Sequence, residues 1–347
     1  MYRVVVCGAA GIVLLAQAAR GNKLRSPWDG RKIQQTDTPY TCPAAPPFAT
    51  TIEIGSYYID AKASVIDPEK LEAFQKASES STHLSQYVAL AADAYLYKGS
   101  RPAAACVYSL LDAAARADAW AGKMPGFQGV YAQNWLLSAV AMSYLKVRES
   151  GVGKQQQDAA IQEWFDHLAV RVGEYFDAEV KRLGSDGENN HLYWAGLAVA
   201  AAGIADHDQE AFDWGIAAYR MGVDAIQPDG SLIAEMNRGQ MALHYNLYAL
   251  ASLIMLAELG EVNGVDLYAY DKGAIHRLVN FCIAGLEDPT RVEKITGVKQ
   301  IVSLPYAGGD VGWAVPYVRR FPNVKLSDLI AKAPWVRYTT WGGAPPD

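Results

Sequence analysis

The sequence is poor in residues that build metal or nucleic-acid sites. It has only four cysteines in 347 residues, and none stands in a CxxC pair or in the Cys/His spacing of zinc ligands. Basic residues are outnumbered by acidic ones, 31 to 37, which gives a net charge of −6. We therefore expect no metal site and no nucleic-acid partner, because nucleic-acid-binding proteins usually present a basic surface. An acidic sugar remains a possible ligand, since a cleft can be locally positive on an acidic protein.

Long apolar runs are scarce, and the clearest lies at the N-terminus. Arg3 precedes the apolar stretch 4–16, and Ala16-Gln-Ala18 has the small-x-small pattern of a cleavage site. The stretch is shorter than the roughly 20 residues that a membrane span needs. We expect residues 1–19 to be a signal peptide, and the mature protein to be periplasmic or secreted, without a membrane partner after cleavage.

Strand patterns are almost missing from the rest of the chain. Apolar positions recur at three- and four-residue spacing in segments that are separated by Gly- and Pro-containing breakers. The expected helices span residues 85–97, 103–120, 131–149, 156–173, 175–183, 193–205, 210–226, 234–260 and 272–284, and a further one begins at Pro68. About ten helices joined by short loops predict an all-α protein made of helical hairpins.

The domain organisation predicted from composition is simple. Residues 20–51 are rich in Pro, Thr and charge and should form an extended arm, because prolines at this density exclude a helix. No linker interrupts residues 52–347, which we interpret as one domain. Its tail, from Ile301 onward, is expected to be irregular and to wrap back over the helices. Cys282 lies in an apolar stretch and is expected to be a buried free thiol.

The clearest chemical motif is Asn189-Asn190-His191-Leu192-Tyr193-Trp194, directly before a helix of small apolar residues. The polar side chains therefore lie at the N-terminal end of that helix, where backbone N–H groups lack partners and the helix dipole is positive. Such an end favours an anion.

A second motif supplies a permanent cation and a phenol. Arg238 and Tyr245 are seven residues apart, which on one helix places them on the same face, two turns from each other. Glu235 is the only carboxylate within reach of Arg238 along the helix. Unless Glu235 pairs with it, Arg238 is free to bind a ligand.

Together these motifs resemble the alginate lyase family, the mannuronate-specific polysaccharide lyases of family 5. The resemblance covers most of the chain and includes four further blocks: Phe212-Asp-Trp214, Asp229-Gly230 followed by Glu235, Asn263-Gly-Val-Asp-Leu267, and Trp313-x-x-Pro316-Tyr317. It implies an incomplete (α/α) toroid, an anionic uronate polysaccharide as partner, no cofactor, and a monomer. It also implies a disulfide between Cys42 and Cys106, and a catalytic centre of Asn190, His191, Arg238 and Tyr245.

These four side chains match the demands of β-elimination from a 4-linked uronate. The C6 carboxylate must be neutralised, the C5 proton removed, and the departing O4 protonated. Asn190 and Arg238 can neutralise the carboxylate, and Tyr245 can protonate O4. When the C5 hydrogen and O4 leave from the same face, as in mannuronate, Tyr245 can act as base and acid. When the C5 hydrogen and O4 leave from opposite faces, His191 would have to be the base. The sequence leaves both routes open.

Aromatic residues near the motifs are candidates for binding sugar. Tyr57 and Tyr58 lie in a segment that forms a lid in the family, although a plain surface connector fits the same pattern. His244 should flank Tyr245, because adjacent helical positions point about 100° apart. The remaining candidates are Tyr193 and Trp194 for the cleft floor and Trp135, Tyr248 and Trp313 for stacking, and we expect core packing to take at least two of these five.

The sequence departs from the family pattern where cations are usual. Gly239 and Met241 stand near Arg238, and Tyr57-Tyr58 replaces a Lys-Tyr pair. Fewer cations weaken the electrostatic binding of a long polyanion. This departure extends the range of expected substrates to other polyuronates, such as glucuronan or hyaluronan. Two other functions are weighed: a glycoside hydrolase, for which no carboxylate pair stands out, and a non-catalytic polysaccharide-binding protein.

Overall fold

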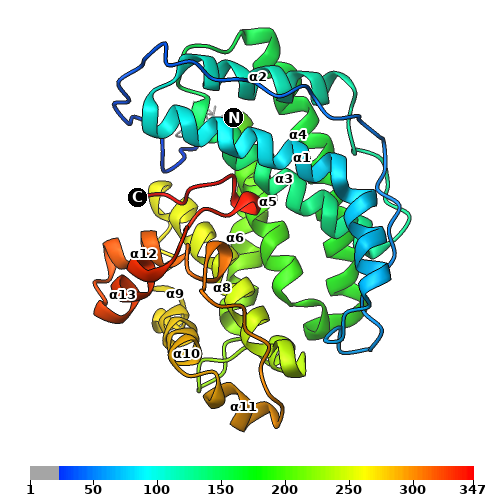
Figure 1. Ribbon diagram of the computed structural model, residues 1–347, viewed down its shortest axis with the longest axis vertical. Coiled ribbons are helices and arrows are strands. Elements are labelled where there is room, and N and C mark those ends of the chain that lie inside the picture. The colour runs from blue at the N-terminus through cyan, green and yellow to red at the C-terminus, as the bar shows by residue number, and fades with distance from the viewer. Residues whose placement is uncertain (1–22) are drawn as a thin grey trace, which may run out of the picture.

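The computed structural model describes residues 23–347, and in this part of the chain all regular elements are helices (Figure 1). Pairing of extended backbone is limited there to isolated bridges, such as Thr36 with Ser100. The prediction of an all-α fold is therefore confirmed. The predicted signal peptide, residues 1–19, lies outside the described residues.

The helices follow one another as hairpins around an incomplete α/α toroid. In Figure 1 the first four lie in the upper and right parts of the molecule and α8 to α13 in the lower left. Their bounds are α1 (Pro68–Lys98), α2 (Arg101–Arg116), α3 (Phe127–Val147), α4 (Gln155–Leu183), α5 (Asn190–Asp206), α6 (Gln209–Asp224), α7 (Ile233–Met236), α8 (Ala242–Val262), α9 (Tyr270–Gly273), α10 (Ile275–Glu287), α11 (Thr290–Thr296), α12 (Ala314–Arg320) and α13 (Val324–Lys332).

Two helices, α5 and α8, form the centre of the core because they are apolar all round. Helix α5 packs against α3, α4, α6 and α8. It approaches α6 closely through Gly196 and Gly215: a Cβ on Gly215 would lie 2.4 Å from the carbonyl oxygen of Gly196. The segment Gly239–Val262, which includes α8, is long and apolar enough to cross a membrane, but 89% of its most apolar window is buried inside the protein. It is therefore a core helix.

Three helix predictions were wrong in detail. Helix α4 continues through Gly173, where a break was expected, because Val172 and Phe176 on either side are buried on one face. The expected helix 234–260 is interrupted at Gly239, whose φ of +57° cannot continue a right-handed helix. The tail beyond residue 300 contains the short helices α12 and α13, where only irregular structure was expected.

Both terminal segments are fastened to the helices. The arm is joined to α2 by the Cys42–Cys106 disulfide, which the family resemblance had implied, whereas Cys282 is free and buried as expected. The tail wraps back over α1 and α3, as predicted. There the buried ion pair between Lys146 and Asp93, 2.8 Å apart, also binds the tail backbone: Lys146 donates to the carbonyl of Gly342, and Asp93 accepts from the N–H of Ala344.

Candidate active site

The start of α5 holds the first part of the site. Asn189 caps the helix, with its side chain accepting a hydrogen bond from the His191 N–H at 3.0 Å. Asn190 is fully buried, and its backbone N–H and side-chain amide donate to the two carboxylate oxygens of Glu235 at 2.8 and 2.9 Å. Glu235 thus pairs with Asn190. Burial raises the pKa of Glu235, although both hydrogen bonds and nearby Arg238 favour its charged form.

Arg238 has no salt-bridge partner in the described part of the chain, and its buried Nε has no hydrogen-bond partner there. Its guanidinium lies 3.8 Å from the ring centroid of Tyr245. The seven-residue spacing had predicted that the two residues lie on the same face of one helix. This prediction is wrong. Arg238 lies in the turn before α8, and the positive φ of Gly239 reverses the chain so that the guanidinium stacks on the phenol.

His191 is held by aromatic rings from α3. Its imidazole stacks on Tyr131 with ring centroids 3.7 Å apart and an interplanar angle of 9°, and Trp135 lies 6.3 Å away. Nδ1 is buried without a hydrogen-bond partner among the described residues. Burial, assisted by the charge of Arg238, lowers the pKa of His191 to about 3. The imidazole is therefore neutral at pH 7.

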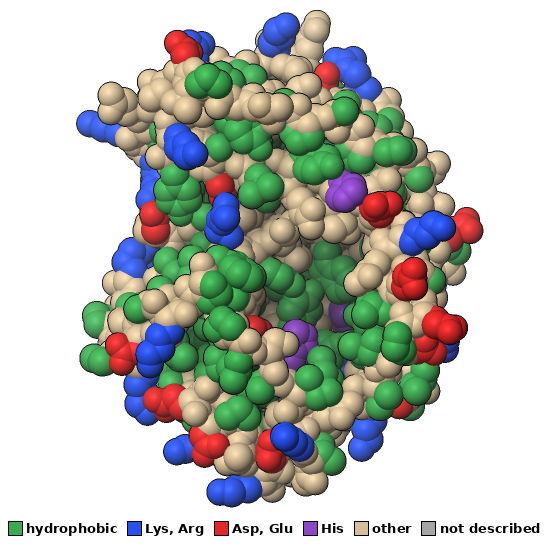
Figure 2. Space-filling view, viewed as in Figure 1, with side chains coloured by type: hydrophobic (Ala, Val, Ile, Leu, Met, Phe, Trp, Pro, Cys, Tyr) green, Lys and Arg blue, Asp and Glu red, His purple; other side chains and the backbone are tan. Residues whose placement is uncertain are grey.

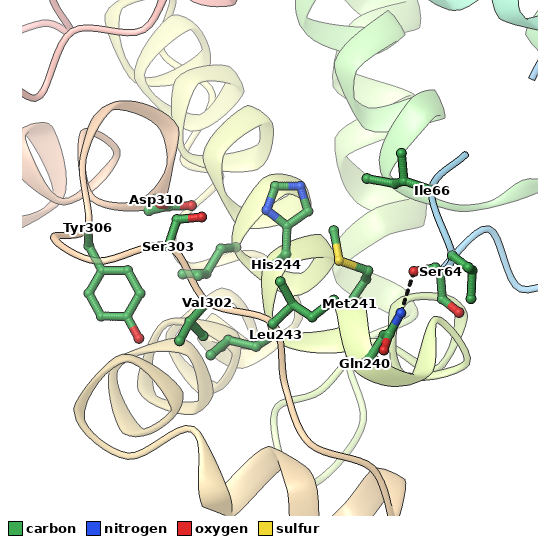
Figure 3. Close-up of a pocket in the computed structure, with 13 residues that line it drawn as sticks. Ser64, Ile66, Gln240, Met241, Leu243, His244, Val302, Ser303, Tyr306 and Asp310 are labelled. Carbon is green, nitrogen blue, oxygen red and sulfur yellow. Dashed lines mark hydrogen bonds between the residues drawn. The ribbon is translucent and has the colours of Figure 1, made fainter. Parts of the chain in front are cut away.

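Tyr245 is buried, and its hydroxyl makes a short contact with the hydroxyl of Tyr58. Burial raises the pKa of Tyr245 despite the opposing charge of Arg238, and raises that of Tyr58 to about 12. Tyr57 packs on Tyr58 with ring centroids 4.5 Å apart. The segment that carries both tyrosines is held at Ser64, whose carbonyl accepts from Gln240 at 2.8 Å (Figure 3). It therefore covers the phenol of Tyr245.

Two adjoining cavities open beside Tyr245, in a face of the molecule that is visibly hollowed (Figure 2). The lid cavity, about 490 Å³, lies between Ser64 to Ile66 and the start of α8, and the tail cavity, about 600 Å³, reaches Tyr248 and Tyr338. His244, Ser303 and Asp310 line both. The ring of His244 stacks on Tyr248 at 6.1 Å. Although His244 faces the cleft, surrounding protein atoms and Arg238 lower its pKa to about 4.

The four residues assigned to catalysis therefore meet in one place. Asn190 and Arg238 are linked through the Glu235 carboxylate and its electrostatic contact with Arg238, and the charge of Arg238 acts on both His191 and Tyr245. Of the candidates for sugar binding, Tyr57, Tyr58, Trp135, His244 and Tyr248 are at least partly accessible around this centre.

Three other candidates are not at the surface of the cleft. Tyr193, Trp194 and Trp313 are at most 1% exposed. The polar atom of each side chain donates a hydrogen bond to a backbone carbonyl: Tyr193 to that of Glu188, Trp194 to that of Tyr248 and Trp313 to that of Asp310. Their rings are enclosed by the core, so the assignment of these three to the floor or to stacking on sugars is wrong. They support the cleft from behind. The expectation that core packing would take at least two of the five candidates is confirmed.

Sequence reasoning missed Tyr131, Tyr338 and Asp310, and it considered Glu235 as a partner of Arg238 rather than of Asn190. Tyr131 belongs to a predicted helix but has no spacing relation to the Asn-His motif. Tyr338 and Asp310 lie in the tail, where no periodicity was available. The described residues contain no group of three or more His, Cys, Asp or Glu that could hold a metal ion.

Comparison with known proteins identifies the family of the chain. The family model described as alginate lyase matches residues 52–292. A polysaccharide lyase of Stenotrophomonas maltophilia is 41% identical over 290 residues, covering 83% of this chain and 84% of the relative. An alginate lyase of Pseudomonas syringae pv. syringae is 31% identical over 321 residues, covering 90% and 84%.

A solved structure gives the same result for the fold. It is a variant of alginate lyase A1-III complexed with a tetrasaccharide, and it superposes with a TM-score of 0.76 at 25% identity, covering 89% of this chain and 85% of that chain. The family model spans more than half of the sequence, and both relatives align over most of their length. The chain therefore belongs to the alginate lyase family.

Proposed function

We propose that this protein, a polysaccharide lyase by family, cleaves 4-linked uronate polymers by β-elimination. The polymers we include are poly-β-D-mannuronate, as in alginate, glucuronan and hyaluronan. The observation that carries the proposal is the packing of the Arg238 guanidinium 3.8 Å from the Tyr245 ring, beside Asn190 and His191. Each chemical demand of the elimination then has a group at one place.

Neutralising the sugar carboxylate falls to Arg238, with help from Asn190 and His191. Arg238 supplies the permanent charge and has no competing salt bridge in the described chain. The Asn190 amide is fixed by the hydrogen bond from its Nδ2 to Glu235, and the second N–H of the same NH2 group is the donor that it can offer to a carboxylate. A neutral His191 can donate one N–H. Withdrawal of charge from the carboxylate acidifies the C5 proton.

The proton transfers fall to Tyr245 when both groups leave from one face of the sugar. As a phenolate it takes the C5 proton, and it returns this proton to O4 as the C4–O4 bond breaks, which leaves a C4=C5 double bond at the new non-reducing end. Arg238 and the Tyr58 hydroxyl are placed to stabilise that phenolate. For a substrate with the groups on opposite faces, neutral His191 is the base.

The direct test is ultraviolet absorbance of the products, because elimination creates a double bond conjugated with the carboxylate. Purified protein should generate this absorbance from at least one of mannuronan, guluronan, glucuronan and hyaluronan. Shortened polymer without absorbance would indicate a hydrolase, and unchanged polymer size on a gel would indicate a binding protein.

We also propose that the chain is exported and acts as a monomer in the periplasm or outside the cell. The Cys42–Cys106 disulfide supports export, because disulfides persist in oxidising compartments. Cell fractionation should recover the protein outside the cytoplasm, and its mass in solution should be that of one chain. Retention in the cytoplasm would contradict the proposal.

A further inference from the structure

The cavities beside the catalytic centre are unusual for a site that binds a polyanion. In the part of the chain that the structure describes, no Lys or Arg lines the lid cavity or the tail cavity. The walls are largely apolar, with Ile66, Leu243 and Val302 on the lid side and Leu304 and Pro305 on the tail side. The hollow in Figure 2 is likewise lined mainly by hydrophobic and uncharged side chains.

Among the described residues, the one acidic side chain that lines these cavities is Asp310. Figure 3 places it beside Ser303, on the segment that faces His244. Its carboxylate accepts a hydrogen bond from the Ala307 N–H, and the cavity walls bring no cation to it. His244 cannot supply that charge at neutral pH, because its pKa is lowered to about 4. A sugar carboxylate in this space would meet the negative charge of Asp310, and no described Lys or Arg lines the walls to offset it.

The same walls suit an uncharged sugar. Asp310 can accept a hydrogen bond from a hydroxyl or acetamido N–H, Ser303 can donate or accept one, and the apolar side chains can pack against the ring or an N-acetyl methyl group. Both cavities fall within the roughly 300–1,000 Å³ range of small-molecule sites. They meet at His244, whose ring centroid is 5.0 Å from that of Tyr245, so their contents lie next to the reacting sugar.

Resting on the lyase function proposed above, we propose that the sugar bound next to the cleaved uronate is uncharged. The preferred substrate class is then a polymer in which uronate alternates with a neutral or N-acetylated hexose. Asp310, together with Ser303, determines this specificity. The catalytic residues act on the uronate, while the Asp310 subsite disfavours a second carboxylate beside it.

Binding and cleavage test the proposal separately. Tyr245→Phe, which should bind without turnover, is titrated calorimetrically with hyaluronan and mannuronate oligosaccharides of equal length. The hyaluronan oligosaccharide should bind at least about tenfold more tightly, because like charges brought together without a counter-ion disfavour the mannuronate chain. Equal or tighter binding of the mannuronate oligosaccharide would overturn the subsite. This result is independent of activity, so a lack of turnover in the parent protein would count against the lyase function instead.

Two substitutions test whether Asp310 and Ser303 determine the preference between the polymers. Asp310→Asn removes the charge, and Ser303→Arg adds a cation to both cavities from an exposed position that leaves Asp310 in place. Each should shift the ratio of kcat/KM, mannuronan over hyaluronan, upward by about fivefold or more. Ser327→Arg, on the exposed face of α13, is the matched control and should leave the ratio unchanged. If both cavity variants fold, as judged by circular dichroism, and neither shifts the ratio, Asp310 and Ser303 do not set specificity and the proposal fails.

Discussion

Glu235 accepts two hydrogen bonds from Asn190, one from the backbone N–H and one from the side-chain amide, at 2.8 and 2.9 Å. Both residues are buried, at 1% and 0% exposure. This contact joins the short helix α7 to the start of α5, and so fixes the distance between the Asn-His motif and the turn that carries Arg238. Within the proposed mechanism, Glu235 is a positioning residue for Asn190 and does not donate a proton to the substrate.

Glu235→Gln should therefore impair catalysis and stability together. The substitution preserves shape, but glutamine keeps a single carbonyl oxygen as acceptor and places an NH2 group against the other Asn190 donor. One hydrogen bond becomes neutral and the other is lost, which we expect to lower the free energy of unfolding by about 1–3 kcal/mol. Misorientation of Asn190 should reduce kcat by about 10- to 100-fold. Steady-state kinetics and chemical unfolding measure both effects. Glu210→Gln, at an exposed position of α6, is the control, and equal behaviour of the two variants would contradict the assignment.

Sequence reasoning placed the polar motif correctly in the fold, because its position depends on local sequence. Asn190 and His191 were placed correctly at a helix start, because an Asn cap and a following apolar run define that boundary by themselves. The relation of Arg238 to Tyr245 was predicted for the wrong reason. They are close because Gly239 reverses the chain, and a periodicity argument assumes an unbroken helix.

The tail shows what sequence reasoning could not reach. Tyr338 enters the cleft as the tail returns across α1 and α3, where Lys146 and Asp93 bind its backbone, and Asp310 enters it because its segment packs against α8. These partners are far apart in sequence, so no local pattern marks them. Being aromatic was equally insufficient to predict which residues line the site. Trp313 and Trp194 are core residues, while Tyr131, which the sequence did not single out, stacks on His191.

Tyr245→Phe should abolish elimination while leaving polymer binding nearly intact. Only the hydroxyl is removed, and the ring that packs against Arg238 remains. We expect a loss in kcat of at least about 1,000-fold, since the group acts at both proton transfers. Tyr58→Phe removes the neighbouring hydroxyl and should cost only about tenfold, through weaker stabilisation of the phenolate. A Tyr245→Phe enzyme that keeps normal turnover would show that another residue moves the protons.

His191 can be assigned by comparing two substitutions on mannuronan. An asparagine can donate a hydrogen bond to the sugar carboxylate but cannot accept a proton at neutral pH. If Tyr245 performs both transfers, His191→Asn should retain turnover within about tenfold of the parent, and His191→Ala should lose about 100-fold. Equal inactivation of the two variants would make His191 the base. The readout is the initial rate of absorbance increase at saturating polymer.

Measured in Asp310→Asn, so that the Asp310 carboxyl does not contribute, the pH dependence of kcat/KM on mannuronan should lack a limb near pH 6.5, the usual pKa of histidine. The pKa values of His191 and His244 are lowered to about 3 and about 4, so both imidazoles are neutral from pH 5 upward. The phenolate of Tyr245 becomes more populated as pH rises toward its raised pKa, so the rate should increase through the neutral range. A rate that rises from acid pH and then levels off with a midpoint near 6.5 would indicate a titrating histidine.

The preference between polymers should itself depend on pH through Asp310, whose pKa is raised to about 6 by burial. His244, Tyr306 and Tyr338 are the titratable groups near it, and none of them changes charge between pH 5 and pH 7. Below pH 6 Asp310 is protonated and no longer repels a sugar carboxylate. The ratio of mannuronan to hyaluronan cleavage should therefore rise as pH falls from 7 to 5, and taking a ratio cancels effects common to both substrates. In Asp310→Asn the ratio should be independent of pH over this range, and a parent-like slope in that variant would assign the effect to another group.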